Sequence, residues 1–146
     1  MLMLPDDFHP AILPPTEVDE LPAWWFIWAN GQLLVHRADG GLELPLASVW
    51  PFAQWLTVRR LYLGTLRGQP CYAAEAATAD APPGWTFQNL RGLWTRMDEA
   101  LLGVAGQALQ LIEWDRNHQF CGQCGAPTQQ RADERGRRCP ACELMF

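Results

Sequence analysis

Four cysteines near the end of the sequence have the residue type and spacing of a metal site. They form two Cys-x-x-Cys pairs, Cys121 with Cys124 and Cys139 with Cys142, and fourteen residues separate the pairs. Thiolates are strong zinc ligands, and a two-residue gap lets each short turn present two sulfur atoms to one ion. The spacing therefore predicts one tetrahedral structural zinc site, in a zinc ribbon whose intervening residues fold as a hairpin.

Two other kinds of cysteine chemistry use the same residue types. The four cysteines could form two disulfides, or either pair could be a dithiol redox centre. A redox motif normally lies between a strand and a helix, whereas both pairs here lie among Gly, Pro and Arg residues that favour turns. We therefore favour zinc. Cys71, the fifth cysteine, lies in an apolar run and is predicted to be a buried core thiol.

Polar residues beside the cysteines have competing interpretations. His118 is a possible zinc ligand, but four thiolates already complete a tetrahedron, so we expect a structural histidine packed beside Phe120. The hairpin between the pairs carries arginines that could contact a nucleotide phosphate or RNA. A solvated hairpin tip is the more ordinary interpretation of this arginine set, which comprises Arg131, Arg135, Arg137 and Arg138.

The residues before the ribbon predict an α+β domain with a small antiparallel β-sheet. Aromatic and β-branched runs within residues 23–36 are joined by Asn30-Gly31, a dipeptide typical of a type I′ turn. A second hairpin is predicted within residues 59–75, with its turn at 67–70. Residues 46–56 contain a proline, so a short helix or an irregular segment is as well supported as a strand.

A long amphipathic helix is predicted between the sheet and the ribbon. Apolar residues recur at helical spacing from Leu90 to Ile112, and Asn89 is a candidate N-cap. The stripe indicates a helix packed on the sheet. Glycines inside this stretch each cost about 1 kcal/mol relative to alanine, so two helices broken near residues 103–106 are an alternative.

Three tryptophans of the first predicted hairpin are candidates for stacking on a base. Trp24, Trp25 and Trp28 have the ring type that nucleotide-binding sheets use. Alternate side chains of a strand face opposite sides of a sheet, so one set can be buried while the other meets a dimer partner. A core or interface role therefore outranks ligand stacking.

Composition limits the domain organisation. The chain has 146 residues, 49% of them hydrophobic, enough for one domain with a small appendage. We expect a Pro-rich extended arm at 1–22, the α+β domain at 23–118 and the zinc ribbon at 119–146.

The net charge of −5 has the wrong sign for a chain whose main task is nonspecific nucleic-acid binding. No apolar stretch approaches a membrane span of about eighteen residues, and the acidic start lacks the positive n-region of a signal peptide. We therefore expect a cytoplasmic location, in which the thiolates stay reduced and available to a metal.

The lead-in to the first cysteine pair carries a family resemblance. Residues 108–125 read ALQLIEWDRNHQFCGQCG and are followed by Cys139-Pro-Ala-Cys142, while residues 63–72 look like a hairpin upstream of the ribbon. These features closely resemble the N-terminal half of the NADH pyrophosphatases, a branch of the Nudix hydrolases. The resemblance implies a homodimer with a structural zinc ribbon. It also implies a following Nudix domain that uses Mg²⁺ or Mn²⁺ to hydrolyse the diphosphate of NADH, NAD or NAD-capped RNA.

The carboxylate cluster of the Nudix box is missing from this sequence. Nudix chemistry needs Gly-x5-Glu-x7-Arg-Glu-x-x-Glu-Glu-x-Gly to hold divalent cations, whereas the eight glutamates here are scattered. The sequence ends at Phe146, so we expect the N-terminal and zinc-ribbon half of a longer enzyme, inactive alone and serving architecture and dimerisation. The alternative is a free-standing zinc-ribbon adaptor that binds nucleic acid or protein.

Overall fold

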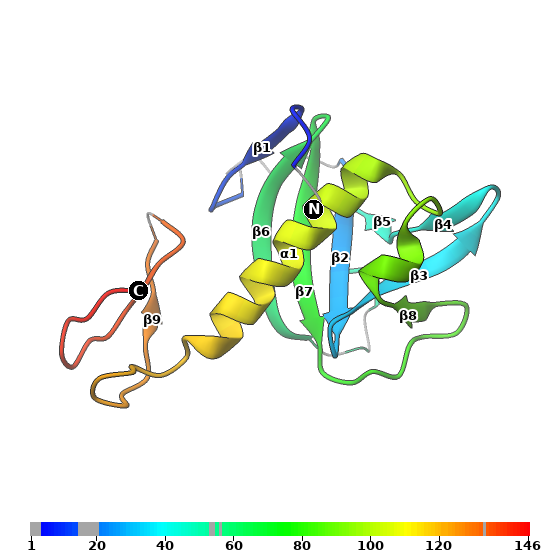
Figure 1. Ribbon diagram of the computed structural model, residues 1–146. Coiled ribbons are helices and arrows are strands. Elements are labelled where there is room, and N and C mark those ends of the chain that lie inside the picture. The colour runs from blue at the N-terminus through cyan, green and yellow to red at the C-terminus, as the bar shows by residue number, and fades with distance from the viewer. Residues whose placement is uncertain (1–3, 15–20, 53–54, 56, 133) are drawn as a thin grey trace.

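A computed structural model describes residues 4–14, 21–52, 55, 57–132 and 134–146. It confirms the α+β class, with one mixed sheet, one long helix and a small C-terminal hairpin (Figure 1). No helix in these ranges is long and apolar enough to cross a bilayer. The elements are β1 (Phe8–Pro10), β2 (Ala23–Ala29), β3 (Gln32–Ala38), β4 (Gly41–Glu43), β5 (Leu46–Ala47), β6 (Thr57–Leu66), β7 (Gln69–Ala76), β8 (Thr86–Gln88), the 3-10 helix η1 (Leu90–Leu93), α1 (Glu99–Asn117), β9 (Gln129–Gln130) and β10 (Arg137–Arg138).

Two tight hairpins form the centre of the sheet. β2 and β3 are joined by Asn30 and Gly31, whose φ angles of 50° and 74° are those of the predicted type I′ turn. β6 and β7 are joined by Arg67 and Gly68, with φ angles of 52° and 79°. The second hairpin is therefore confirmed, and its turn is two residues long instead of the four that we predicted.

The two hairpins associate through a parallel pair, which differs from the antiparallel sheet predicted. The strand order is β1-β6-β7-β2-β3-β4, with β5 paired to β2 and β8 paired to β3. β2 and β7 run parallel, in register from Trp24 beside Cys71 to Trp28 beside Glu75. Turn residues specify each hairpin locally, but the edge by which two hairpins meet is decided by packing between distant residues.

Two of the less definite predictions fall partly outside the described residues. In the predicted arm, residues 1–3 and 15–20 are not described, and residues 8–10 form β1 against β6. In the segment 46–56, residues 53, 54 and 56 are not described, and the first two residues form the short strand β5.

The predicted long helix is interrupted at residues 94–98 and not near residues 103–106, where a break was predicted as the alternative. Asn89 caps only η1, by accepting a hydrogen bond from Gly92 N at 3.0 Å. α1 has its own N-cap, Asp98, and continues without a break through residues 103–106. The chain turns at residues 94–98, where Thr95 has a φ of 66°. As a result Trp94, which lies inside the stretch predicted as one apolar stripe from Leu90 to Ile112, is 45% exposed.

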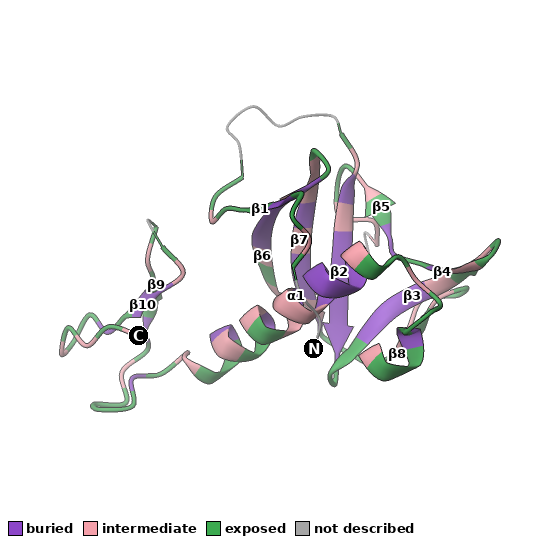
Figure 2. Cartoon of the chain, turned by 45° about the horizontal axis from the view of Figure 1, so that its top comes forward, coloured by how far each residue is buried: buried purple, intermediate pink, exposed green. Residues whose placement is uncertain are grey.

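Both faces of the sheet are covered by apolar side chains, from different sources. α1 crosses one face diagonally (Figure 1), and Phe26 and Trp28 of β2 pack beneath it. Trp25 and Ile27 face the other side, where aromatic residues from the segments around β5 and β8 cover them. The middle strands are accordingly buried along most of their length (Figure 2). Trp25 and Trp28 are thus core residues, and Cys71 is a fully buried core thiol, as predicted.

The contact between β1 and β6 depends on a glycine. Gly64 has a φ of 131°, and a Cβ built on it would lie 2.1 Å from the carbonyl oxygen of His9. We expect Gly64→Ala to lower the free energy of unfolding by about 3 kcal/mol, because strained backbone and an unavoidable backbone clash act together. Urea unfolding measures this loss.

The matched control is Gly68→Ala. Gly68 also has a positive φ, of 79°, but nothing lies within 4 Å of the position that a Cβ would take there. This control should cost only about 1–2 kcal/mol from backbone strain. Equal losses at Gly64 and Gly68 would show that close packing of β1 against β6 does not matter for stability.

Candidate metal centre and its joint with the sheet domain

The four predicted cysteines come together in space. All four Sγ atoms lie within 4.8 Å of one another, with Cys121 3.5 Å from Cys142 and Cys124 3.3 Å from Cys139. Sulfur atoms bound to one tetrahedral zinc ion lie about 3.8 Å apart, given a Zn–S bond of about 2.3 Å. Among the residues that the structure describes, these four form the one cluster in which at least three metal-ligating side chains lie close enough to share an ion.

The two cysteine turns have the same backbone hydrogen bonds. In the first, Cys121 N donates to Ala126 O at 2.8 Å, and Gly125 N donates to Cys121 O at 2.9 Å. The second turn repeats both bonds at the same spacing from Cys139, again at 2.8 and 2.9 Å. The repeated geometry lets each turn present its two sulfur atoms to a shared point.

Backbone N–H groups inside these turns point at sulfur. The hydrogen bond from Cys124 N, together with one from Gln123 N at 3.4 Å, lowers the pKa of Cys121 to about 6. The N–H of Leu144 acts in the same direction on Cys142, but desolvation and neighbouring thiols outweigh it and raise the pKa of Cys142 to about 12. Thiolates this close together repel one another, so full ionisation at neutral pH requires a cation among them. The donor set therefore fits zinc.

One position differs between the two turns in a way that a mutation can test. Gly125 and Glu143 each directly follow a Cys-x-x-Cys pair, and both have positive φ angles, of 80° and 65°. Glycine adopts this conformation without cost, whereas other residues lose about 1–2 kcal/mol. Glu143 also pairs with Arg138 at 3.0 Å, but an exposed ion pair adds little. We expect Glu143→Gly to raise stability by about 1 kcal/mol.

Thermal unfolding of the zinc-loaded protein measures this gain. Glu143→Gln is the control, because it removes the charge and keeps the strained conformation, so it should not stabilise the protein. A lower melting temperature for Glu143→Gly than for Glu143→Gln would contradict the explanation from backbone strain.

His118 lies outside the sulfur cluster, as predicted, although its neighbours differ from the prediction. Its ring stacks on Trp114 with centroids 4.7 Å apart and meets the edge of Phe146 at 5.5 Å. Its Nδ1 lies 2.6 Å from Trp114 O, one turn back along α1. Phe120, the expected neighbour, is 66% exposed. His118 therefore ends the helix and packs against Phe146 of the ribbon.

Two of the four ribbon arginines lie against the rest of the protein and not in a solvated tip, whereas Arg138 is exposed. Arg137 is buried, and all three of its guanidinium nitrogens donate: Nη1 to Asp115 Oδ1 at 3.0 Å, Nε to Thr128 Oγ1 at 2.8 Å and Nη2 to Thr128 O at 3.1 Å. Arg135 reaches back to the sheet domain and donates to Tyr62 O and Ala11 O. The prediction of a solvated tip was wrong for these two residues because it ignored what the hairpin packs against.

Asp115 is the centre of an ionic joint between ribbon, helix and sheet. Its carboxylate lies 3.0 Å from Arg137 of β10 and 3.2 Å from Nε of Arg59 of β6. Arg59 in turn lies 3.3 Å from Glu75 of β7, and Glu75 lies 2.6 Å from Arg116 of α1. We call these five residues the Asp115 network. Its alternating charges connect the ribbon to both strands of the β6–β7 hairpin.

The sequence carries a signal for Asp115 that the prediction of a solvated hairpin did not use. Residues 101, 105, 108 and 112 form the buried stripe of α1, and Asp115 occupies the next position on the same stripe. A carboxylate on an apolar stripe is expensive to bury without a cationic partner. Its position therefore implies that a buried arginine pairs with it. Only the tertiary structure shows that its partners are Arg137 and Arg59.

Two comparisons with protein-family models cover nearly the whole chain. Residues 22–114 match the NADH pyrophosphatase-like rudimentary NUDIX domain, and residues 116–146 match the NADH pyrophosphatase zinc ribbon domain. The first match spans strands β2 to β8 and most of α1, and the second contains all four clustered cysteines.

Curated relatives with similar sequences share one description, NAD-capped RNA hydrolase NudC. The relative from Deinococcus radiodurans is 37% identical over 140 residues, which are 96% of this chain and 46% of the relative. The relative from Stutzerimonas stutzeri is 39% identical over 104 residues, 71% of this chain and 34% of the relative. One from Pseudomonas fluorescens Pf-5 is 37% identical over 131 residues, 86% of this chain and 45% of the relative. The chain thus spans less than half the length of these relatives.

Proposed function

This chain belongs to the NADH pyrophosphatase family, and we propose that it is the non-catalytic N-terminal and zinc-ribbon part of a hydrolase acting on NAD(H) or NAD-capped RNA. The relatives named as NAD-capped RNA hydrolases support this activity for the longer protein. The catalytic carboxylates and their Mg²⁺ or Mn²⁺ ions then belong to a Nudix domain outside these 146 residues.

The observation that carries a structural role is the Asp115 network. It holds the ribbon at a fixed position beyond the C-terminal end of α1, through buried ion pairs that involve both α1 and the sheet. A ribbon fixed in this way can hold a following domain in a defined orientation, whereas a freely hinged ribbon cannot. In this proposal residues 23–118 form the domain and 119–146 form the ribbon that supports the active site.

We propose that Cys121, Cys124, Cys139 and Cys142 hold one structural zinc ion. When bound, zinc supplies folding energy and leaves no open coordination position for water, because four thiolates complete its tetrahedron. The chain's own residues prepare the site through the two matched turns and their N–H groups. Thiolates of this kind persist in a reducing compartment, so we propose that the protein is cytoplasmic.

The proposal is tested by the coding sequence that follows the codon for Phe146. A Nudix box within the same reading frame is the expected result. A stop codon directly after Phe146 contradicts the proposal and favours the free-standing adaptor. Hydrolysis of NADH by the longer protein, and none by the 146-residue chain, is the corresponding biochemical result.

We also propose that the protein forms a homodimer. Static light scattering after size-exclusion chromatography should then give twice the chain mass of 16.5 kDa. A mass of one chain at micromolar concentration would contradict dimerisation through this part of the protein and leave the zinc proposal unaffected.

A further inference from the structure

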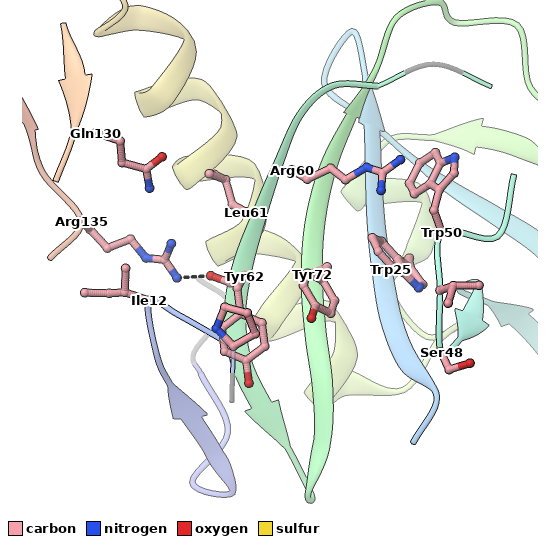
Figure 3. Close-up of a pocket in the computed structure, with 12 residues that line it drawn as sticks. Ile12, Trp25, Ser48, Trp50, Arg60, Leu61, Tyr62, Tyr72, Gln130 and Arg135 are labelled. Carbon is pink, nitrogen blue, oxygen red and sulfur yellow. Dashed lines mark hydrogen bonds between the residues drawn. The ribbon is translucent and has the colours of Figure 1, made fainter. Parts of the chain in front are cut away.

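A cleft of about 440 Å³ lies between the sheet and the ribbon, on the side of the sheet away from α1 (Figure 3). Arg60 and Tyr62 of β6 line it, with Trp25, Trp50 and Tyr72 on one side and Arg135 of the ribbon on the other. The Asp115 network lies at the C-terminal end of α1 and contributes no residue to this cleft. The cleft is therefore separate from the metal centre and from the ionic joint.

Four aromatic rings form a continuous row along the cleft. Tyr62 meets Tyr72 at 5.2 Å, Tyr72 stacks on Trp25 at 4.8 Å, and Trp25 meets the edge of Trp50 at 5.3 Å. The rings come from β6, β7, β2 and the segment after β5, so the row runs across the strands. Trp25 and Tyr62 are buried and form a floor, while Tyr72 and Trp50 are only half-buried. The accessible rings can pack against a planar ligand.

Arginines lie at the two ends of this row. The Arg60 guanidinium lies 4.4 Å from the centre of the Trp50 ring, and its Nε donates to Thr57 Oγ1 at 3.1 Å. Arg135 donates to main-chain carbonyls, and partial burial lowers its pKa. Among the described residues, neither arginine has a carboxylate partner.

The charge of the cleft is opposite to that of the chain. The sequence has a net charge of −5, yet the residues that line the cleft include two arginines and no aspartate or glutamate. Guanidinium groups bind phosphate through several N–H donors at once, and aromatic rings stack on bases of any identity. An anion that carries a planar ring satisfies both features.

We propose that this cleft binds a nucleotide, with its phosphate at Arg60 or Arg135 and its base against Trp50 and Tyr72. The nucleotide can be a free mononucleotide or one unit of single-stranded RNA, because both present the same phosphate and ring. The inference uses residues of this chain alone. It therefore holds or fails independently of the hydrolase activity proposed above.

Fluorescence anisotropy of a labelled RNA octamer with the zinc-loaded chain tests the proposal, and unlabelled AMP serves as competitor. Arg60→Gln should weaken octamer binding about 10-fold, because it removes a charged hydrogen-bond donor to phosphate. Arg60→Lys keeps the charge but loses the planar stack on Trp50, so its affinity should fall between those of the wild-type chain and Arg60→Gln. Trp50→Leu should weaken AMP competition by removing a stacking ring.

The matched control is Arg91→Gln. Arg91 is an exposed arginine of η1, and η1 packs on the same side of the sheet as α1, away from the cleft. Arg91→Gln removes one positive charge, as Arg60→Gln does. If the RNA is attracted by the arginines of the cleft and not by the overall charge, this variant should change octamer affinity less than 2-fold. Melting curves confirm that each variant is folded, and a shifted Trp50 indole N–H resonance in NMR spectra locates the ligand independently of the arginine variants.

Each outcome decides between alternatives. Competition by AMP identifies a mononucleotide site, and octamer binding without AMP competition identifies RNA; both support the cleft as a nucleotide site when Arg60→Gln alone is impaired. Equal weakening by Arg60→Gln and Arg91→Gln overturns the proposal in favour of nonspecific charge attraction. Failure of the wild-type chain to bind either probe also overturns it.

Discussion

Cys139→Ala is expected to abolish stoichiometric zinc binding and to unfold the ribbon while the sheet domain stays folded. Cys139 is fully buried at the centre of the sulfur cluster, 3.3 Å from Cys124. Structural zinc contributes on the order of 10–16 kcal/mol of apparent binding energy in small zinc domains. The ribbon has only the short strands β9 and β10 and no apolar core of its own among the described residues, so without the metal little inside the ribbon itself stabilises its fold.

Metal analysis and NMR spectra together measure this effect. The variant should contain far less than one zinc per chain, and the amide signals of residues 119–146 should collapse to unfolded positions. Excess chelator should produce the same spectrum from the wild-type protein.

Cys71→Ala is the matched control, since it removes a buried thiol from the sheet instead of the ribbon. It should retain one zinc per chain and lose only the modest stability expected for a small cavity. Full zinc content and an unchanged melting temperature in Cys139→Ala would show that the cysteines do not hold a structural ion.

Asp115→Asn is expected to destabilise the protein by about 3–5 kcal/mol, because it leaves the buried Arg137 without its counter-charge. Asp115 lies 3.0 Å from Arg137 and 3.2 Å from Arg59, and the exposed fractions of the three side chains are only 10%, 10% and 13%. Asparagine keeps the size of the side chain, so the loss reports charge. Arg59 retains Glu75, at 3.3 Å, and Arg137 is the cation left without a carboxylate.

Glu113→Gln is the control on the same helix, two residues away and exposed to solvent. It should change the free energy of unfolding by no more than about 0.5 kcal/mol. The double variant Asp115→Leu, Arg137→Leu should recover most of the loss, since an apolar pair has no buried charge to compensate. Comparable losses in Asp115→Asn and Glu113→Gln would show that the network does not stabilise the joint.

Hydrogen exchange distinguishes local opening at the joint between ribbon and sheet from global unfolding of the protein. In Asp115→Asn, amides of the ribbon and of the last turn of α1 should lose protection before those of β2 and β7. Uniform loss across the sheet would indicate that Asp115 supports the core as a whole and does not specifically fix the ribbon.

The parts of the fold that follow from short stretches of sequence were predictable. Asn30-Gly31 specifies its hairpin because the dipeptide adopts the positive φ angles that the turn needs. The cysteine cluster is equally local, since each Cys-x-x-Cys turn is closed by its own backbone hydrogen bonds. Asp98 is hard to identify as the helix N-cap because the apolar stripe continues without a gap in the sequence across the turn at Thr95.

The parts that depend on distant contacts were not predictable. The parallel pairing of β2 with β7 joins residues about 47 positions apart, such as Trp24 and Cys71, and no turn residue encodes it. The arginines of the ribbon illustrate the same point. A basic, polar hairpin has the composition of a solvated loop, and only the positions of Asp115 and Tyr62 show that two of its cations are inside a joint.

The hydrogen bond from Arg135 to Ala11 connects residues 124 positions apart, so segments near the two ends of this sequence meet at one point. During synthesis the ribosome releases β1 long before it releases the ribbon, and β1 must wait for its partner β6. Arg135 also donates to Tyr62 O of β6, so its full contact needs β6 and the segment after β1 together. We therefore expect docking of the ribbon to be a late folding event that occurs only when both segments have left the ribosome.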